Sequence, residues 1–126
     1  VSTTGGVFLS DFGIARPVLG WFIRRCAGTW PYMSPEHFDA DPDRIDRRAD
    51  VWSLGAVLFR LLTGEDAFAP ASMESVERRR LAVAGPARRL GDVAPELHDE
   101  IPDLLPGLES LVRRCLDPAP QRRPDS

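Results

Sequence analysis

The sequence predicts a mainly α-helical domain with one short pair of strands at its start. Two segments are the main evidence for helices. Residues 50–63 are apolar almost without interruption, and apolar residues recur at steps of three and four over 105–116. By contrast, the apolar run at residues 7–9 is short and lies between glycines, which suits a buried strand better than a helix.

Composition limits the classes of protein that this chain can belong to. Its 126 residues are 43% hydrophobic, enough for one core but too few for two ordinary domains. The net charge of −3 argues against nucleic acid as a partner, because acidic residues separate the small arginine clusters. No apolar run reaches the roughly 18 residues of a membrane helix, and the first residues lack a secretion-signal pattern. We therefore expect a cytoplasmic protein with no membrane segment in this chain. Cys26 and Cys115 lack metal-ligand spacing and predict neither a zinc site nor a disulfide.

The first strand pair leads directly to an acidic residue. Gly5 and Gly6 suit the turn between two strands within residues 1–10, and Asp11 follows where the second strand ends. A carboxylate in that position needs a partner, and either a metal ion or a group of hydrogen-bond donors would satisfy it. Taken alone, Asp11-Phe12-Gly13 fits a simple turn as well as a metal site.

Two short motifs together carry a family resemblance. Asp11-Phe12-Gly13 and Ser34-Pro35-Glu36 are similar to the two ends of the activation segment of serine/threonine protein kinases. The resemblance implies that residues 1–126 are part of a two-lobed α+β kinase domain, namely its C-terminal lobe from just before the first motif. Residues 11–36 would be the activation segment. It further implies that Asp11 binds Mg²⁺ at the phosphates of ATP, with Phe12 and Gly13 as structural anchors. The implied activity is transfer of the ATP γ-phosphate to Ser and Thr hydroxyls of a protein substrate.

The loop between the two motifs has an unusual composition. It contains no Ser, Thr or Tyr between Gly13 and Gly28, so we do not expect activation by phosphorylation there. Residues 17–23 are instead strongly apolar. Two interpretations stay open: this stretch contacts a protein partner, or it folds back onto its own lobe as a short helix.

The residues after this loop are assigned to the substrate side by the resemblance. It gives Thr29 a structural role near the catalytic Asp, where Thr29 helps to shape the acceptor site. It implies that Trp30, Pro31 and Tyr32 line the wall beside the residue that follows the phosphoacceptor. Simple core packing explains the two aromatic side chains equally well.

Residues 50–63 predict the clearest helix, and its apolar surface places it in the middle of the domain. Asp50 is expected as the N-cap and Gly64 as the C-terminal stop. The helix resembles the central helix of the kinase C-terminal lobe, which implies that Asp50 also anchors the catalytic loop. Gly55 inside the helix is less favourable than Ala by roughly 1 kcal/mol, which indicates either that another backbone approaches there or that the glycine has no special reason.

Residues 72–126 are expected to form a C-terminal helical subdomain. Ser72 is expected to cap a helix that runs to about Val83, with the three arginines at 78–80 on its solvated face. Prolines then divide the chain into short pieces, where His98 is expected to be exposed and unpaired. In the last helix we expect one buried face, with Arg113 and Arg114 pointing outward. The residues of that face are Leu105, Leu108, Leu111, Val112, Cys115 and Leu116.

The end of the chain resembles the closing motif of the kinase family. In that motif an Arg before Pro reaches back to the Glu of the activation segment. Arg123 is therefore expected to pair with Glu36, with Arg122 as the alternative.

Several residues that a kinase needs do not occur in this sequence. All 16 basic residues are Arg, and the chain contains neither Lys nor Asn. Kinases use a strand Lys, a catalytic-loop Asp and an Asn at the nucleotide, and Arg does not replace Lys there. We expect these groups, including the catalytic residues, upstream in the parent domain. Residues 1–126 alone should then be inactive and bind ATP weakly or not at all. A pseudokinase or protein-interaction module is the alternative, against which the intact Asp11, Thr29 and Glu36 count.

Overall fold

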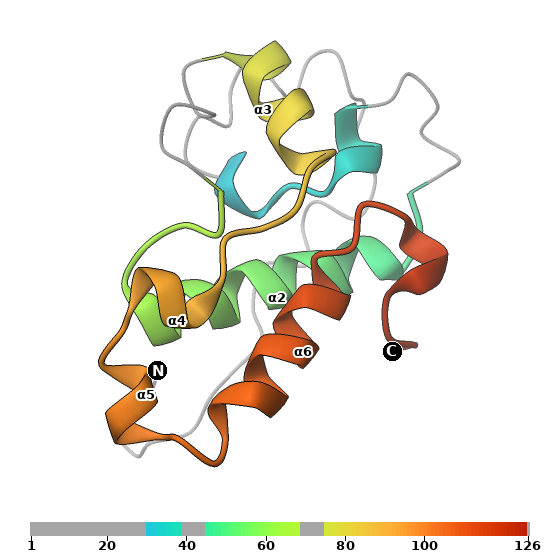
Figure 1. Ribbon diagram of the computed structural model, residues 1–126. Coiled ribbons are helices and arrows are strands. Elements are labelled where there is room, and N and C mark those ends of the chain that lie inside the picture. Colours follow the sequence, from blue (N-terminus) through green and yellow to red (C-terminus); the bar gives the residue numbers. More distant parts are fainter. Residues whose placement is uncertain (1–29, 39–44, 69–74, 126) are drawn as a thin grey trace, which may run out of the picture.

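The described part of the chain is helical. The computed structural model describes residues 30–38, 45–68 and 75–125 (Figure 1). No strand occurs in these ranges, which agrees with the predicted mainly α-helical C-terminal lobe. The strand pair expected within residues 1–10 lies outside the described residues. Among the described helices, none is both long enough and apolar enough to cross a membrane.

Eight helical elements make up the described ranges. Two short 3₁₀ turns come first, one helix of sixteen residues follows, and the remaining helices are shorter. In chain order they are η2 (Trp30–Tyr32), η3 (Pro35–Phe38), α2 (Arg48–Thr63), α3 (Val76–Val83), α4 (Leu90–Val93), α5 (Leu97–Glu100), α6 (Leu105–Cys115) and η6 (Pro120–Arg122).

Helix α2 is the element on which the others pack. It lies beside α6, with η2 and α3 on another side and α4 near its C-terminal end (Figure 1). Trp52 and Phe59 of α2 are fully buried, and the Trp52 ring stacks on Phe68 with 5.5 Å between ring centroids. Leu105, Val112 and Leu116 join this core from the last helix and the residue that follows it. The same core therefore supports both the turns η2 and η3 and the C-terminal helices.

The N-terminal end of α2 differs from the prediction. The helix begins at Arg48, so Asp50 lies inside the first turn, and the expectation that Asp50 is the N-cap is wrong. Asp46 accepts a hydrogen bond from the Arg48 amide instead, at 2.8 Å. The prediction failed because several Asp residues, including Asp46 and Asp50, precede the apolar run, and the sequence does not show which of them caps the helix. At the other end, Gly64 stops the helix as expected, with φ of 73° and its N–H bonded to the carbonyl of Arg60.

The surface of α2 is also less buried than expected. Leu54, Val57 and Leu61 are 62%, 40% and 78% exposed. These residues are three and four positions apart and form one apolar stripe along the helix. Within the described ranges, this stripe has no covering element.

Gly55 explains how closely α2 and α6 approach. A Cβ added at Gly55 would lie 2.5 Å from Cys115 Cβ and 3.3 Å from a side-chain carbon of Leu116. A close contact was expected here, but the group that approaches is a side chain and not a backbone.

Helix α3 corrects two further expectations. Its N-cap is Ser75, which accepts the Arg78 amide hydrogen at 3.1 Å, so the helix starts three residues after the expected cap at Ser72. Its C-terminal end at Val83 agrees with the prediction. Arg79 is fully buried, so the run of three arginines is not uniformly a solvated face. Three consecutive residues of a helix point in directions that differ by about 100° each, so the triplet does not share one face.

The C-terminal helices largely follow the predicted pattern. Helix α6 has Pro106 in its first turn and buries Leu105, Val112 and Cys115, while Arg113 and Arg114 are exposed. Leu111 is 42% exposed and does not belong to the buried face. His98 on α5 is exposed, as expected.

Candidate functional site

The candidate site is the segment formed by η2 and η3. It packs against α2 and α3, as Figure 1 shows. Met33 and Ser34 connect the two turns and are buried. Pro35 opens η3, a position where the missing N–H is tolerated because first-turn amides have no partner within the helix. The described segment is thus a compact pair of turns with its centre withdrawn from water.

A buried ion pair closes this segment. Arg123 Nη1 donates to Glu36 Oε1 at 2.6 Å, and Arg123 Nη2 donates to Glu36 Oε2 at 2.9 Å. The two side chains are 0% and 5% exposed. The arrangement is the bidentate geometry in which a guanidinium binds a carboxylate most strongly. The pair expected from the sequence is therefore present, across 87 positions of the chain.

The remaining donors of Arg123 are also satisfied. Its guanidinium donates to the carbonyls of Arg48, Asp117 and Pro118 at 2.9, 2.8 and 3.4 Å. The same group lies 5.0 Å from the ring centroid of Trp52. Full pairing is what makes burial of a charge tolerable. Arg123 therefore joins η3 to the start of α2 and to the end of the chain.

The pKa values of Glu36 and His37 are both lowered, the first by Arg123 and the second by burial. Burial alone would raise the pKa of Glu36, but the hydrogen bond and the charge of Arg123 outweigh it and hold that pKa below its usual value. Burial lowers the pKa of His37, although the neighbouring charges of Glu36 and Asp50 oppose the shift. His37 Nδ1 lies 2.7 Å from Ser34 Oγ. At neutral pH, Glu36 is consequently ionised and His37 is neutral.

Two further hydrogen bonds hold the first turn. Arg79 Nη2 of α3 donates to the carbonyl of Pro31 at 2.6 Å. Ser53 Oγ of α2 donates to the carbonyl of Tyr32 at 2.9 Å. The Tyr32 side chain is partly buried against the core, so the core-packing explanation applies to it at least in part. Two successive carbonyls are thus fixed by two different helices.

Sequence reasoning missed both of these donors. Ser53 is one of few polar residues in an apolar helix, which is a signal that it has a specific partner. Arg79 gave no such signal, because it stands between two other arginines. Asp50, which was expected to anchor a catalytic loop, is exposed at the start of α2, and its side chain makes no hydrogen bond within the described ranges.

The metal-binding half of the expected site cannot be placed. Asp11, Phe12, Gly13 and Thr29 lie outside the described residues, as does the apolar stretch 17–23. For Trp30 the structure describes the backbone of η2. In the ranges that are described, no group of three or more His, Cys, Asp or Glu side chains could hold a metal ion.

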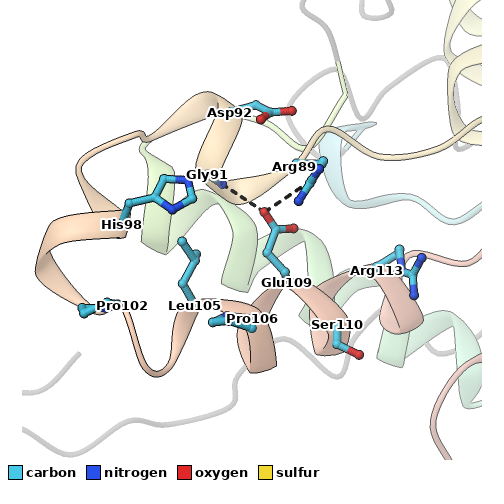
Figure 2. Close-up of a pocket in the computed structure, with 10 residues that line it drawn as sticks. All are labelled: Arg89, Gly91, Asp92, His98, Pro102, Leu105, Pro106, Glu109, Ser110 and Arg113. Atoms are coloured by element: carbon cyan, nitrogen blue, oxygen red, sulfur yellow. Dashed lines mark hydrogen bonds and ion pairs between the residues drawn. The ribbon is translucent and has the colours of Figure 1, made fainter.

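A separate cavity lies between α4, α5 and α6, with a volume of about 600 Å³ (Figure 2). Glu109 points into it, accepts the Gly91 amide hydrogen at 3.0 Å and lies 4.0 Å from Arg89 Nε. His98 packs against Gly91 on the same wall. None of the residues expected at the functional site lines this cavity. Its lining residues are Arg89, Gly91, Asp92, His98, Pro102, Leu105, Pro106, Glu109, Ser110 and Arg113.

Comparisons with known proteins agree on one family. The family model "Protein kinase domain" matches residues 1–126. Serine/threonine-protein kinase PknB of Mycolicibacterium smegmatis is 40% identical over 104 residues, which cover 77% of this chain. PknB of Mycobacterium tuberculosis is 35% identical over 128 residues, or 98% of this chain, and PknJ of Mycobacterium bovis is 35% identical over 120 residues, or 93% of it.

The matched region is a small part of each relative. It spans 16% of the M. smegmatis protein and 19% of the M. tuberculosis and M. bovis proteins. The family match extends over the whole chain, and the ion pair that the two kinase motifs implied is present between Glu36 and Arg123. On these grounds the chain belongs to the eukaryotic-like serine/threonine protein kinases.

Proposed function

We propose that this chain is the substrate-side part of an enzyme that transfers the γ-phosphate of ATP to Ser and Thr hydroxyls of proteins. The observation that carries the proposal is the buried bidentate pair of Glu36 and Arg123. An isolated structural pair of this kind gives little net stability compared with an apolar substitute. Its value is that it fixes the segment before Glu36 in one position, which an acceptor site requires.

Within this segment, Thr29 and residues 30–32 have different roles in binding the protein substrate. Thr29 shapes the acceptor site, and Trp30, Pro31 and Tyr32 form the wall beside the residue that follows the phosphoacceptor. The hydrogen bonds from Arg79 and Ser53 support this assignment, because they hold the backbone of that wall from two helices. Arg123 anchors the lobe beneath it through its hydrogen bonds to Glu36 and to the carbonyl of Arg48. Asp50, exposed at the start of α2, is available to hold the catalytic loop of the parent domain, the role that the family resemblance gives it.

The metal and the nucleotide belong to the other half of the site. Asp11 supplies a carboxylate oxygen, the kind of ligand that Mg²⁺ prefers, and Phe12 and Gly13 keep it in place. When bound, Mg²⁺ neutralises charge on the phosphates. The sequence has neither the Lys nor the Asn that kinases use at the nucleotide, so we infer that residues 1–126 do not complete an ATP site. Calorimetry of residues 1–126 should detect no tight, Mg²⁺-dependent ATP binding, and tight binding would refute this inference.

A second candidate function is a pseudokinase or protein-interaction module. The exposed stripe of Leu54, Val57 and Leu61 favours it, since apolar surface of this kind commonly marks a contact. On that view the segment around Glu36 is scaffold only, and no phosphate is transferred.

Phosphate transfer by the whole protein decides between the two functions. With Mg²⁺, labelled ATP and Ser- or Thr-containing peptides, the wild type should transfer phosphate. Asp11→Asn should reduce transfer by at least about a hundredfold, because the charge at the metal is lost. Asp99→Asn, the same change at an exposed position of α5, is the control and should leave transfer unchanged. No transfer by the wild type, or equal transfer by Asp11→Asn, would contradict the proposed enzyme.

A further inference from the structure

Arg79 is a buried arginine in the middle of α3. The proposed function gives it no role beyond holding the backbone of residues 30–32. Its side chain is fully buried, and its guanidinium lies 4.9 Å from the ring centroid of Phe68. It donates one hydrogen bond, from Nη2 to the carbonyl of Pro31. Its Nε and Nη1 atoms are buried and have no hydrogen-bond partner among the described residues.

Packing alone does not account for an arginine at this position. Burying a guanidinium with two unpaired donors is unfavourable, and an apolar residue of similar length would fill the same space without that penalty. Burial lowers the pKa of Arg79 to about 10, with the charge of Asp66 acting in the opposite direction. The side chain therefore stays protonated at neutral pH. What Arg79 provides, and an apolar residue does not, is one short charged hydrogen bond to η2.

The acceptor of this hydrogen bond is the centre of the proposed wall. Pro31 has no N–H, so its carbonyl is the polar group by which its backbone can be held. The next carbonyl, of Tyr32, is held by Ser53 from α2. The two donors come from different helices, and among the described residues the hydrogen bond of Arg79 is the one that joins this turn to α3.

We propose that Arg79 is a positioning residue that sets the acceptor-site wall and, through it, the preference for the substrate residue after the phosphoacceptor. This inference rests on the proposed function, which assigns the wall to residues 30–32. Arg79 is fully buried and therefore does not touch the substrate itself. It acts through the position of the Pro31 carbonyl, so it affects peptide recognition and leaves ATP recognition unchanged.

The test compares three variants of the whole kinase. Arg79→Met removes the charged donor and keeps the length of the chain, and Arg79→Lys keeps the charge without the planar group that covers Phe68. Arg80→Met is the matched control, because Arg80 is the next residue of α3 and is exposed. The first readout is hydrogen exchange of the amides in residues 32–38. The second is kcat/KM for Ser peptides that differ only in the residue after the phosphoacceptor, together with the KM for ATP.

Loss of one charged hydrogen bond predicts effects of about tenfold. Relative to Arg80→Met, Arg79→Met should speed amide exchange in residues 32–38 by about that factor. It should change the ratio of kcat/KM between the best and the worst peptide by at least about fivefold, with an unchanged KM for ATP. Arg79→Lys should give values between those of Arg79→Met and Arg80→Met, both for amide exchange and for the ratio of kcat/KM.

Two results would overturn the inference. One is unchanged exchange in residues 32–38 of a folded Arg79→Met variant. The other is an equal loss of activity toward all peptides together with a changed KM for ATP, which a general structural role predicts. If Arg79→Met fails to fold, Arg79→Lys decides, and peptide ratios equal to those of Arg80→Met would then overturn the inference.

Failure of the proposed function is recognised separately. If the wild type phosphorylates none of the peptides, the enzyme assignment is wrong. Hydrogen exchange needs no activity, so it still shows whether Arg79 holds the turn.

Discussion

At the scale of single residues, Glu36 and Arg123 depend on each other more than any other described pair. Both charges are almost completely removed from water, and each is the counter-charge of the other. An uncompensated buried charge is far more unfavourable than the intact pair is favourable. Mutations of the two residues should therefore not act independently.

A double-mutant cycle in the parent domain measures this dependence. Glu36→Ala and Arg123→Ala should each lower the free energy of unfolding by about 3–5 kcal/mol, because each leaves one buried charge without a partner. The free energy of unfolding of the double variant should be lowered by much less than the sum of the two single losses. Arg122→Ala, at the exposed neighbouring position, is the control and should stay within about 0.5 kcal/mol of wild type. Additive losses in urea unfolding would show that the pair is not coupled.

The low pKa of Glu36 predicts how stability depends on pH. The pKa of this carboxyl is lower in the folded than in the unfolded chain, so its pairing contributes stability above the unfolded value of 4.5. That contribution is lost as the pH falls through the folded pKa. Glu36→Gln cannot titrate, so its free energy of unfolding should fall less than that of wild type from pH 7 to acid. Parallel pH profiles of the two proteins would argue against the shift.

Single residues also show what sequence can and cannot reveal. Glu36 and Arg123 were paired correctly because both lie in recognisable motifs. The sequence predicts a solvated Arg79, whereas the structure buries it, because which arginine faces inward depends on the packing of α3 against η2 and Phe68. A charge run carries no information about that packing.

At the scale of elements, the contact between α2 and α6 depends on the missing side chain of Gly55. Cys115 and Leu116 occupy the space that a Cβ at Gly55 would need. The glycine therefore allows the two helices to approach, although it weakens the helix itself.

Two glycine substitutions test this contact. Gly55→Ala should lower the free energy of unfolding by about 1–3 kcal/mol, since overpacking outweighs the gain in helix propensity. Gly107→Ala in α6 is the matched control, because nothing lies within 4 Å of its added Cβ. It should be neutral or stabilise by up to about 1 kcal/mol. Thermal unfolding that ranks the two variants in the opposite order would contradict the described packing.

Helix ends were predicted less well than helix bodies. The C-terminal stop at Gly64 was predicted correctly, because glycine adopts the positive φ that ends a helix and is easily recognised in the sequence. The N-terminal caps of α2 and α3 were each misplaced by three residues, since several Asp residues precede α2 and two Ser residues precede α3. Which of them caps the helix depends on where the chain enters the fold.

At the scale of the whole molecule, α2 carries an apolar stripe that the described elements leave uncovered. The apolar pattern of this helix predicts neighbours on all sides, and therefore burial of Leu54, Val57 and Leu61. In the described structure these three residues are exposed. We infer that this stripe is covered by parts of the parent kinase outside the described residues. If those parts lie beyond residues 1–126, the segment alone should be poorly stable and self-associate.

Light scattering of residues 1–126 tests this expectation. The wild-type segment should associate as its concentration rises, and a variant with Leu54→Gln and Leu61→Gln should remain monomeric over the same range. Leu81→Gln on α3 is the control, because Leu81 is 66% exposed and lies outside the stripe. A wild-type segment that stays monomeric would contradict the inference.

The central claim is that residues 30–32 form the wall beside the substrate residue that follows the phosphoacceptor. Photo-crosslinking measures this most directly, with the whole kinase and a Ser peptide that carries the photoreactive group at that residue. The account predicts crosslinks at Trp30, Pro31 or Tyr32, which competing unlabelled peptide abolishes. Crosslinks confined to other regions, such as the cavity around Glu109 between α4, α5 and α6, would contradict it.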